Sequence, residues 1–350
     1  MKKKIAILLA ICLMLTPALI GCGSKPVSTT DTPINDPATQ KSAEPEIAAT
    51  PEPTPVPPNP SFSVANMDVS IGGAEWVTFS DEVALCIYLD YTNTTGMIIQ
   101  PSNELSFSAT QNGEELEVPR RGDTKEQRAL MEHQHRRLFP GAVNRAAVYC
   151  LAADDVTEIV ITFEDRNEDI KKEVTLDPAN MWEIKPPKDN PPAAELASIE
   201  GFSGSKAHFD SSFSTLSEGD LEILRHEFVE FEGAKYVVVY FNIEVTGNME
   251  EGETKDPYLM TNCFAFQDGM QLGSSTTQDD RMSYGINVYT IYDQIPEVAA
   301  HMQNIGPNEP TVSAIIYRLI SDSDVSVAAA FNCSDFTKGG AFIGDTFPVE

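Results

Sequence analysis

The chain has 350 residues, of which 53 are acidic and 24 are lysine or arginine, and its formal net charge is −29. This charge argues against a nucleic-acid ligand, because binding to polyphosphate needs a clustered positive surface. Hydrophobic residues make up 41% of the chain, which is enough for packed cores and argues against disorder throughout. The length predicts about two domains.

The N-terminus has the pattern of a secretory signal peptide. Lys2–Lys4 is cationic, and residues 5–20 carry no charge and are mostly Ile, Leu and Ala. This run is shorter than the about 20 apolar residues of a membrane span. It ends in Leu19–Cys22, which resembles the lipobox of bacterial lipoproteins. The resemblance implies cleavage between Gly21 and Cys22 and a diacylglycerol on the Cys22 sulfur. The alternatives are a plain secretory signal or an uncleaved anchor.

A proline-rich segment follows. Ten of the 24 prolines lie between Pro26 and Pro60, mixed with Ser, Thr, Ala and Glu. Proline lacks the amide donor of helices and central strands, so we expect an extended, disordered stalk over residues 22–61. A passive tether is the simpler interpretation, and a specific partner motif is the alternative.

The remaining sequence contains an internal repeat. Three blocks recur in the same order: 68–91 with 220–243 at an offset of 152, 109–113 with 265–269 at 156, and 149–151 with 317–319 at 168. The period exceeds the 20–50 residues of solenoid repeats, so it indicates two tandem domains.

Each copy has the pattern of a β domain. Near-continuous runs of β-forming residues favour central strands, and Asn-Gly and Asp-Gly dipeptides favour type I′ hairpin turns. Strands at about ten-residue spacing with few helices predict two β-sandwiches. The pattern predicts strands at 83–91, 236–243 and 311–319, turns at 112–113 and 268–269, and short helices at 125–137 and 296–302.

The order of these signals carries a resemblance. A strand with Trp76 precedes a long strand that ends at Asp90–Asn93, and the Gln111–Gly113 hairpin follows. A Pro-Gly turn then leads to the strand with Tyr149 and Leu151. This order resembles an immunoglobulin-like domain of unknown function in Gram-positive surface lipoproteins, akin to the immunoprotective extracellular antigen sandwich. The resemblance implies a fold and a surface location, and it transfers no catalytic residue. The predicted organisation is a signal peptide (1–21), a stalk (22–61), a first sandwich (62–186), a linker (187–198) and a second sandwich (199–350).

Four cysteines remain beyond Cys22 and the signal peptide, two in each predicted domain, in a compartment that permits disulfides. Cys86–Cys150 and Cys263–Cys333 are candidate pairs, and free buried thiols are the alternative. The sequence has no C-x-x-C motif, so we expect no metal site of this type and no cofactor.

Other chemical motifs are weak. We interpret His133-Gln-His135 as solvated histidines rather than metal ligands. His208-Phe-Asp210-Ser211 has the residue types of a catalytic triad, but a triad is defined by geometry and not by spacing. Ser203 misses the spacing of a nucleophile elbow. Acidic clusters favour a solvated surface, with calcium binding as the alternative.

The sequence therefore predicts a lipid-anchored protein on the extracytoplasmic face of the bacterial cell membrane. Its leading role is non-catalytic binding or cell-envelope interaction, with a protein or cell-wall glycan as the expected ligand. The membrane would be reached through the anchor at Cys22. The alternatives are an extracytoplasmic hydrolase and a transporter-associated solute-binding lipoprotein, although the βαβ pattern typical of the latter is missing.

Overall fold

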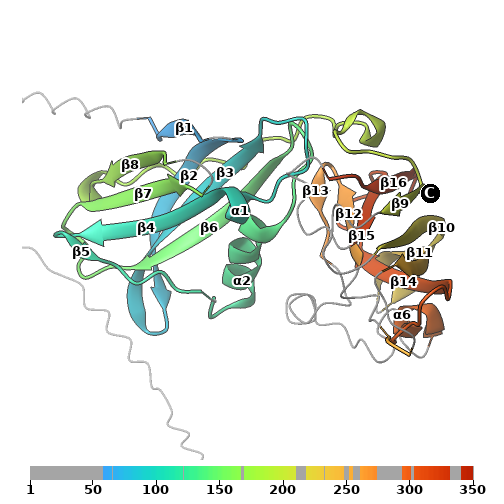
Figure 1. Cartoon of the computed structure of the whole chain (residues 1–350). Helices are drawn as coiled ribbons and strands as arrows, with labels where there is room; N and C mark the ends of the chain where they lie inside the picture. Colours follow the sequence, from blue (N-terminus) through green and yellow to red (C-terminus); the bar gives the residue numbers. More distant parts are fainter. Residues whose placement is uncertain are drawn as a thin grey trace, which may run out of the picture. The chain divides into compact units, whose positions relative to one another are not determined.

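The computed structural model describes residues 58–349 except for 65, 121, 167–168, 210–217, 232, 248–251, 255–260, 274–293, 301–302 and 332–339. Antiparallel strands dominate this part of the chain, which confirms the predicted all-β class (Figure 1). Residues Thr54–Glu350 form one compact unit. The predicted signal peptide, Gly21, Cys22 and most of the stalk lie outside the described residues.

The first sandwich has two four-stranded sheets, ordered β1-β2-β3-β6 and β5-β4-β7-β8. The pairings of β3 with β6 and of β4 with β7 correspond to strands B–E and C–F of an immunoglobulin sandwich. The strands are β1 (Ser61–Val64), β2 (Met67–Phe79), β3 (Glu82–Asn93), β4 (Leu105–Gln111), β5 (Glu114–Glu115), β6 (Val143–Leu151), β7 (Ile159–Asp165) and β8 (Lys171–Leu176). Its helical segments are α1 (Pro101–Glu104), α2 (Lys125–Glu132), η1 (His133–His135) and η2 (Pro178–Asn180).

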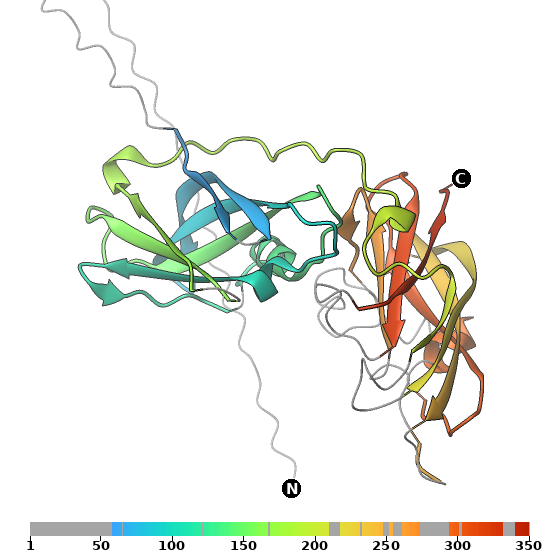
Figure 2. The ribbon, with the colours of Figure 1, turned by 45° about the horizontal axis from the view of Figure 1, so that its top comes forward.

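The second sandwich repeats this arrangement with sheets ordered β9-β10-β11-β14 and β13-β12-β15-β16. Figure 2 shows each sandwich as layers of strands, coloured blue to green in the first and yellow to red in the second. The strands are β9 (Lys206–Phe209), β10 (Glu218–Phe231), β11 (Ala234–Gly247), β12 (Thr261–Gln267), β13 (Met270–Gln271), β14 (Thr311–Arg318), β15 (Val325–Phe331) and β16 (Ile343–Phe347), with η3 (Leu196–Ser198) before them and α6 (Pro296–Ala300) between β13 and β14.

The two strand orders match element for element, which confirms the duplication. Small irregularities match as well. The register of β2 against β3 shifts between Ile71 and Gly73, and that of β10 against β11 shifts between Ile223 and Arg225. Both shifts fall at the same place in the 152-residue alignment.

The predicted alignment of the third block, 149–151 with 317–319, is wrong by one residue. Cys86 pairs with Tyr149 across β3 and β6, whereas its counterpart Val238 pairs with Ile316 across β11 and β14. The structural offset is therefore 167 rather than 168, and Tyr149 corresponds to Ile316 instead of Tyr317. Because strand side chains alternate between faces, this slip exchanges the two sides of the sheet. Tyr149 packs outside the sandwich and Tyr317 packs inside it.

Each sandwich has an outer apolar face that a helix covers. In the first copy, Met131 and Leu130 of α2 pack on Phe79, Cys86 and Tyr149. In the second copy, Val298 of α6 packs in the matching place on β11 and β14. The predicted helices therefore form over 125–132, continued by η1, and over 296–300.

Local signals explain where these elements begin and turn. The Thr124 hydroxyl accepts a hydrogen bond from the Gln127 backbone amide, and the Gln127 side-chain oxygen accepts one from the Thr124 backbone amide, which is a capping box. Asn112-Gly113 has φ values of 55° and 80°, as a type I′ turn requires, and Asp268-Gly269 repeats this conformation. Both predicted hairpins are confirmed.

Candidate functional site

The structure keeps the cysteines of the first sandwich apart. Cys86 faces helix α2, and Cys150 lies on the neighbouring strand but faces the sandwich interior. Both are free thiols, so the candidate bridge between them is absent: their side chains lie on opposite faces of one sheet. Burial raises the pKa of Cys86 to about 11 and that of Cys150 to about 12, so both act as small apolar side chains at neutral pH.

Cys263 in the second sandwich is also a buried free thiol, and burial raises its pKa to about 12. Its candidate partner, Cys333, lies outside the described residues.

The histidine motifs do not assemble a reaction centre. The His133 Nδ1–H donates to the Arg145 carbonyl at 2.8 Å, while His135 Nδ1 lies 2.9 Å from the Ser102 hydroxyl, so the two imidazoles have separate partners. No group of three or more His, Cys, Asp and Glu side chains in the described ranges is arranged to hold a metal ion.

His208 on β9 contacts two carboxylates of β10, Asp220 at 3.1 Å and Glu218 at 3.2 Å. The hydrogen bond that the His208 imidazole donates to the Asp220 carboxylate is the main cause that raises the pKa of His208. The Asp210 and Ser211 of the triad-like motif lie outside the described residues.

A cleft of about 980 Å³ lies beside helix α2 in the first sandwich. One wall is β6, through Ala147, Val148 and Tyr149. The opposite wall is β4, through residues 105–108. The segment 115–120 and the helical turns α1 and η1 complete the lining. We take this cleft as the candidate functional site.

Strand β6 is an edge strand, and part of its edge opens into the cleft. The Leu151 amide donates to the Glu117 carbonyl, and the Arg145 carbonyl accepts from His133, so odd-numbered residues direct their backbone groups away from β3. Ala147 and Tyr149 share this orientation. In the described part of the chain, no backbone hydrogen bond is made by their outward N–H and C=O groups.

Strand β4 is also open on the cleft side. Its neighbour β5 has only two residues and pairs with Thr110 and Gln111. One further bond, from the Leu116 amide to the Ala109 carbonyl, extends this contact. Across the described residues, the edge of β4 at Phe107 has no paired strand.

The cleft is closed where one short segment contacts both sheets. Leu116 bonds to Ala109 of β4, and the next residue, Glu117, bonds to Leu151 of β6. At the opposite end, His135 contacts Ser102 of α1, and Ile99 pairs with Leu138. The open edges therefore face each other between two bridged ends.

The arginine, histidine and glutamate residues that line the cleft are Arg120, Arg166, His135, Glu115 and Glu117. Arg166 donates to the Leu105 carbonyl at 3.4 Å. Within the described ranges, Arg120 and Arg166 take part in none of the ion pairs, although carboxylates greatly outnumber cations in this chain.

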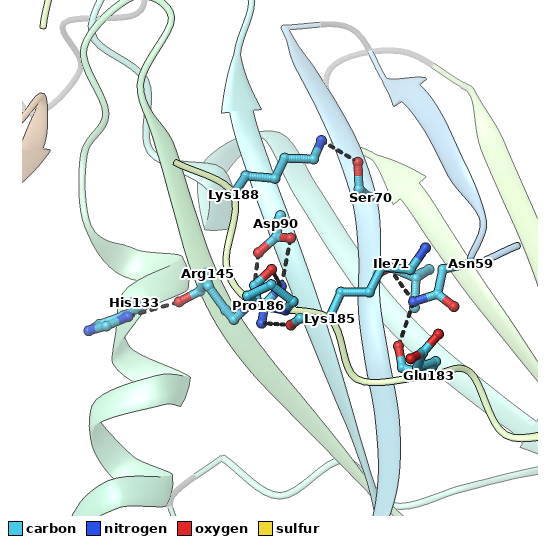
Figure 3. A network of polar contacts seen from close by, with 10 residues as sticks. All are labelled: Asn59, Ser70, Ile71, Asp90, His133, Arg145, Glu183, Lys185, Pro186 and Lys188. Atoms are coloured by element: carbon cyan, nitrogen blue, oxygen red, sulfur yellow. Dashed lines mark hydrogen bonds and ion pairs between the residues drawn. The ribbon is translucent and has the colours of Figure 1, made fainter. Parts of the chain in front are cut away.

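A polar network secures strand β6 on the side away from the cleft (Figure 3). Arg145 forms a bidentate ion pair with Asp90 of β3: its Nε lies 2.7 Å from Asp90 Oδ1 and its Nη2 lies 2.8 Å from Asp90 Oδ2. The same guanidinium donates to the carbonyls of Lys185 and Pro186 in the segment that leaves the sandwich. This segment, 181–188, crosses β2, where the Trp182 carbonyl accepts from Ala74.

Close backbone approach at this crossing requires glycine. Gly73 has φ of +137°, and a Cβ there would lie 2.5 Å from the Ile184 Cα. Asn59, just before β1, donates to both the Ile71 and Glu183 carbonyls, so it joins the start of the sandwich to its end (Figure 3).

Sequence reasoning missed the cleft. A signal for it was present: between the Gln111–Gly113 hairpin and β6, the sequence predicts a helix where immunoglobulin sandwiches commonly place another strand. A helix that packs on the face of a sheet leaves the edge of that sheet unpaired. The predicted helix therefore also indicates that a strand is missing at this edge.

Comparison with known proteins covers the first sandwich in part. A family described as a domain of unknown function (DUF5067) matches residues 42–165, which include β1 to β7. No curated protein matches the chain. Among the described residues, no helix is both long and apolar enough to span a membrane.

Two solved structures are similar at low identity. One is a Staphylococcus aureus protein described as a candidate lipoprotein, with 11% identity, coverage of 37% of this chain and 83% of that chain, and a TM-score of 0.25. The other is a serine-rich repeat protein of Streptococcus agalactiae, with 8% identity, coverage of 81% and 92%, and a TM-score of 0.16. TM-scores this low add nothing to the fold argument.

Proposed function

We propose that this chain is a lipid-anchored, non-catalytic binding protein of the bacterial cell envelope, and that the cleft of its first sandwich holds the ligand. The observation that carries the proposal is the cleft, which combines uncovered strand edges with two arginines that have no carboxylate partner in the described residues. A concave site with a few convergent polar groups is where proteins most often bind ligands. The ligand is a protein or a cell-wall glycan.

The anchor is supported by the lipobox-like Leu19–Cys22 and the stalk-like segment behind it. Two acyl chains suffice for stable membrane attachment. Cells that express the chain are labelled with radioactive palmitate, and the protein is recovered from the membrane fraction. We expect label on the native chain and none on Cys22→Ala. An unlabelled native chain, or label that persists in Cys22→Ala, would remove the anchor from the proposal.

Binding at the cleft is tested by photo-crosslinking on intact cells. The photoreactive residue p-benzoylphenylalanine replaces Ser106 on the cleft wall in one variant and Lys172 on exposed β8 in the matched control. We expect a discrete crosslinked product from position 106 and none from position 172. Equal products from both positions, or none from position 106, would count against the cleft as the binding site.

A further inference from the structure

We propose that the open edge of β6 binds its ligand by strand addition: an extended peptide segment that carries a carboxylate pairs with the backbone of Ala147 and Tyr149. The inference rests on the proposed function, since it specifies the ligand class for the same cleft. Addition of a peptide strand to a sheet edge derives affinity from main-chain hydrogen bonds and specificity from neighbouring side chains.

The first argument is the orientation of the backbone. Ala147 and Tyr149 each direct one N–H and one C=O outward, which together make two donors and two acceptors at the spacing of a strand. Residues on either side are already bonded, Arg145 to His133 and Leu151 to Glu117. The uncovered stretch is thus bounded, and it suits a short segment in extended conformation.

The second argument is the place of the cleft relative to the strand. Val148 faces the sandwich interior, whereas Ala147 and Tyr149 face helix α2. All three line the cleft, so the space lies beside the edge of β6 and not over one of its faces. A peptide in this space would lie in the plane of the sheet, where strand pairing occurs.

The same reasoning holds across the cleft. Phe107 of β4 packs against the core, while its neighbours Ser106 and Ser108 alternate with it, and all three line the space. The cleft therefore has the edge of a strand on each side. The edge of β6 offers the longer unpaired stretch, because the Leu105 amide bonds to Pro101 and the Ala109 carbonyl bonds to Leu116.

The third argument is charge. Arg120 and Arg166 line the cleft without an ion pair in the described part of the chain, and the His135 imidazole lines it as well. Glu115 and Glu117 also line it, so the cleft is not uniformly positive. The Glu117 carbonyl is held at Leu151, beyond the unpaired stretch. A carboxylate on the peptide would give these two arginines an ion-pair partner.

The test begins with a display library of random decapeptides selected against the full mature chain. We expect the enriched peptides to carry Asp or Glu among β-forming residues and to lack central proline. The best peptide is then synthesised without N-methyl groups and in two N-methylated versions, one methylated on its odd-numbered amides and one on its even-numbered amides. One of these versions loses the donors that face β6. We expect its affinity to fall by about tenfold or more, since each hydrogen bond is worth about 1 kcal/mol.

Protein variants give the second arm. Ala147→Pro removes an N–H that points away from β3, so the internal ladder stays intact and proline is tolerated at an edge. We expect it to weaken binding by about tenfold, since one main-chain hydrogen bond is lost and the proline ring crowds the edge. Arg166→Glu should weaken binding by about threefold to tenfold, whereas Lys172→Glu, the same charge change on β8, should alter it less than about twofold.

Three results would overturn strand addition: no enriched peptide, equal affinity of the two N-methylated versions, or an unchanged affinity in folded Ala147→Pro. Should Ala147→Pro fail to fold, the N-methylated peptides decide the question on the native protein. A glycan crosslinked at position 106 would leave the proposed function standing while this inference fails.

Discussion

Asp90 and Arg145 are both almost excluded from solvent, with 4% and 11% of their side chains exposed, and they neutralise each other across β3 and β6. Arg145 also holds two carbonyls of the departing segment 181–188. Removing one partner of such a pair leaves a buried charge without compensation, which costs far more than the pair contributes as a whole.

We therefore expect Arg145→Met to lower the free energy of unfolding by roughly 3–5 kcal/mol in urea denaturation. The double variant Asp90→Leu/Arg145→Met should recover much of this loss, because no charge stays buried. Lys171→Met is the control, since it breaks an exposed pair with Glu164 and should change stability by less than about 1 kcal/mol. A double variant no more stable than Arg145→Met would contradict this account.

His133 makes the stability of the first sandwich depend on pH. Burial, and then the nearby Arg136 charge, lower its pKa to about 4, from an ordinary value near 6.5. Between these values the unfolded chain binds a proton that the folded chain does not, so stability falls as pH drops from about 6.5 to about 4. The full loss is about 3 kcal/mol.

Replacement of this histidine tests the assignment. Urea midpoints measured from pH 7.5 to 4 should decline less steeply in His133→Gln than in the native chain. His135→Gln, two residues away and exposed, is the control and should leave the slope unchanged. Parallel slopes for the native chain and His133→Gln would rule out this histidine as the source.

At the scale of elements, one buried glutamine in each sandwich holds the loop that follows β6 or its counterpart β14. The Gln111 amide accepts from Ala153 and donates to the carbonyls of Asp154 and Thr157. Gln267 repeats this with Ile320, Ser321 and Ser323. Both side chains are at most 2% exposed.

Because an unsatisfied buried polar group costs about 1–3 kcal/mol, Gln111→Ala should lower the free energy of unfolding by at least about 2 kcal/mol, and Gln267→Ala by a similar amount. Gln303→Ala, at an exposed position, should stay within about 0.5 kcal/mol of the native chain. Chemical denaturation measures all three. Glutamine variants as stable as Gln303→Ala would show that the loops do not depend on this bracing.

Elements could be predicted where sequence signals are local. The long strands and both hairpin turns follow from runs of β-formers and from residues that accept positive φ, and helix α2 lies within the predicted helix at 125–137. Register could not be predicted in the same way. The slip at Tyr149 arose because Tyr-x-Leu recurs in both copies, although Ile316 occupies its structural place.

The helix predicted in place of a strand is a local signal for the cleft, but it does not establish that the edge of β6 stays uncovered. Whether an edge strand is covered depends on segments far apart in sequence, such as Glu117 and Leu151 or His133 and Arg145. The partners of buried cysteines likewise depend on which face each one occupies. Cys86 and Cys150 lie on adjacent strands, and only the register separates their faces.

At the scale of the whole molecule, charge is the dominant property. Removal of a signal peptide with three lysines would leave a net charge of about −32. Such a charge destabilises the folded state through self-repulsion, and salt screens it. We expect the melting temperature of the mature chain to rise by several degrees between about 10 mM and 500 mM NaCl, and equally in choline chloride.

Calcium separates general screening from specific binding. If the acidic clusters are simply solvated, calcium at micromolar concentration should leave the melting temperature unchanged. A rise at micromolar calcium would instead favour a cation site among them. A fall in melting temperature with NaCl would contradict the self-repulsion argument.

The contact of Asn59 with Glu183 has a mechanical consequence. The polypeptide enters and leaves the first sandwich at one point, so tension along the chain pulls on neighbouring positions rather than across the core. Such a pull would peel β1 and the segment 181–188 away from β2, one hydrogen bond after another. The first sandwich would thus lengthen at low force while β2, β3 and β6 and the whole second sheet stay paired, so it would yield to tension step by step before its core opens.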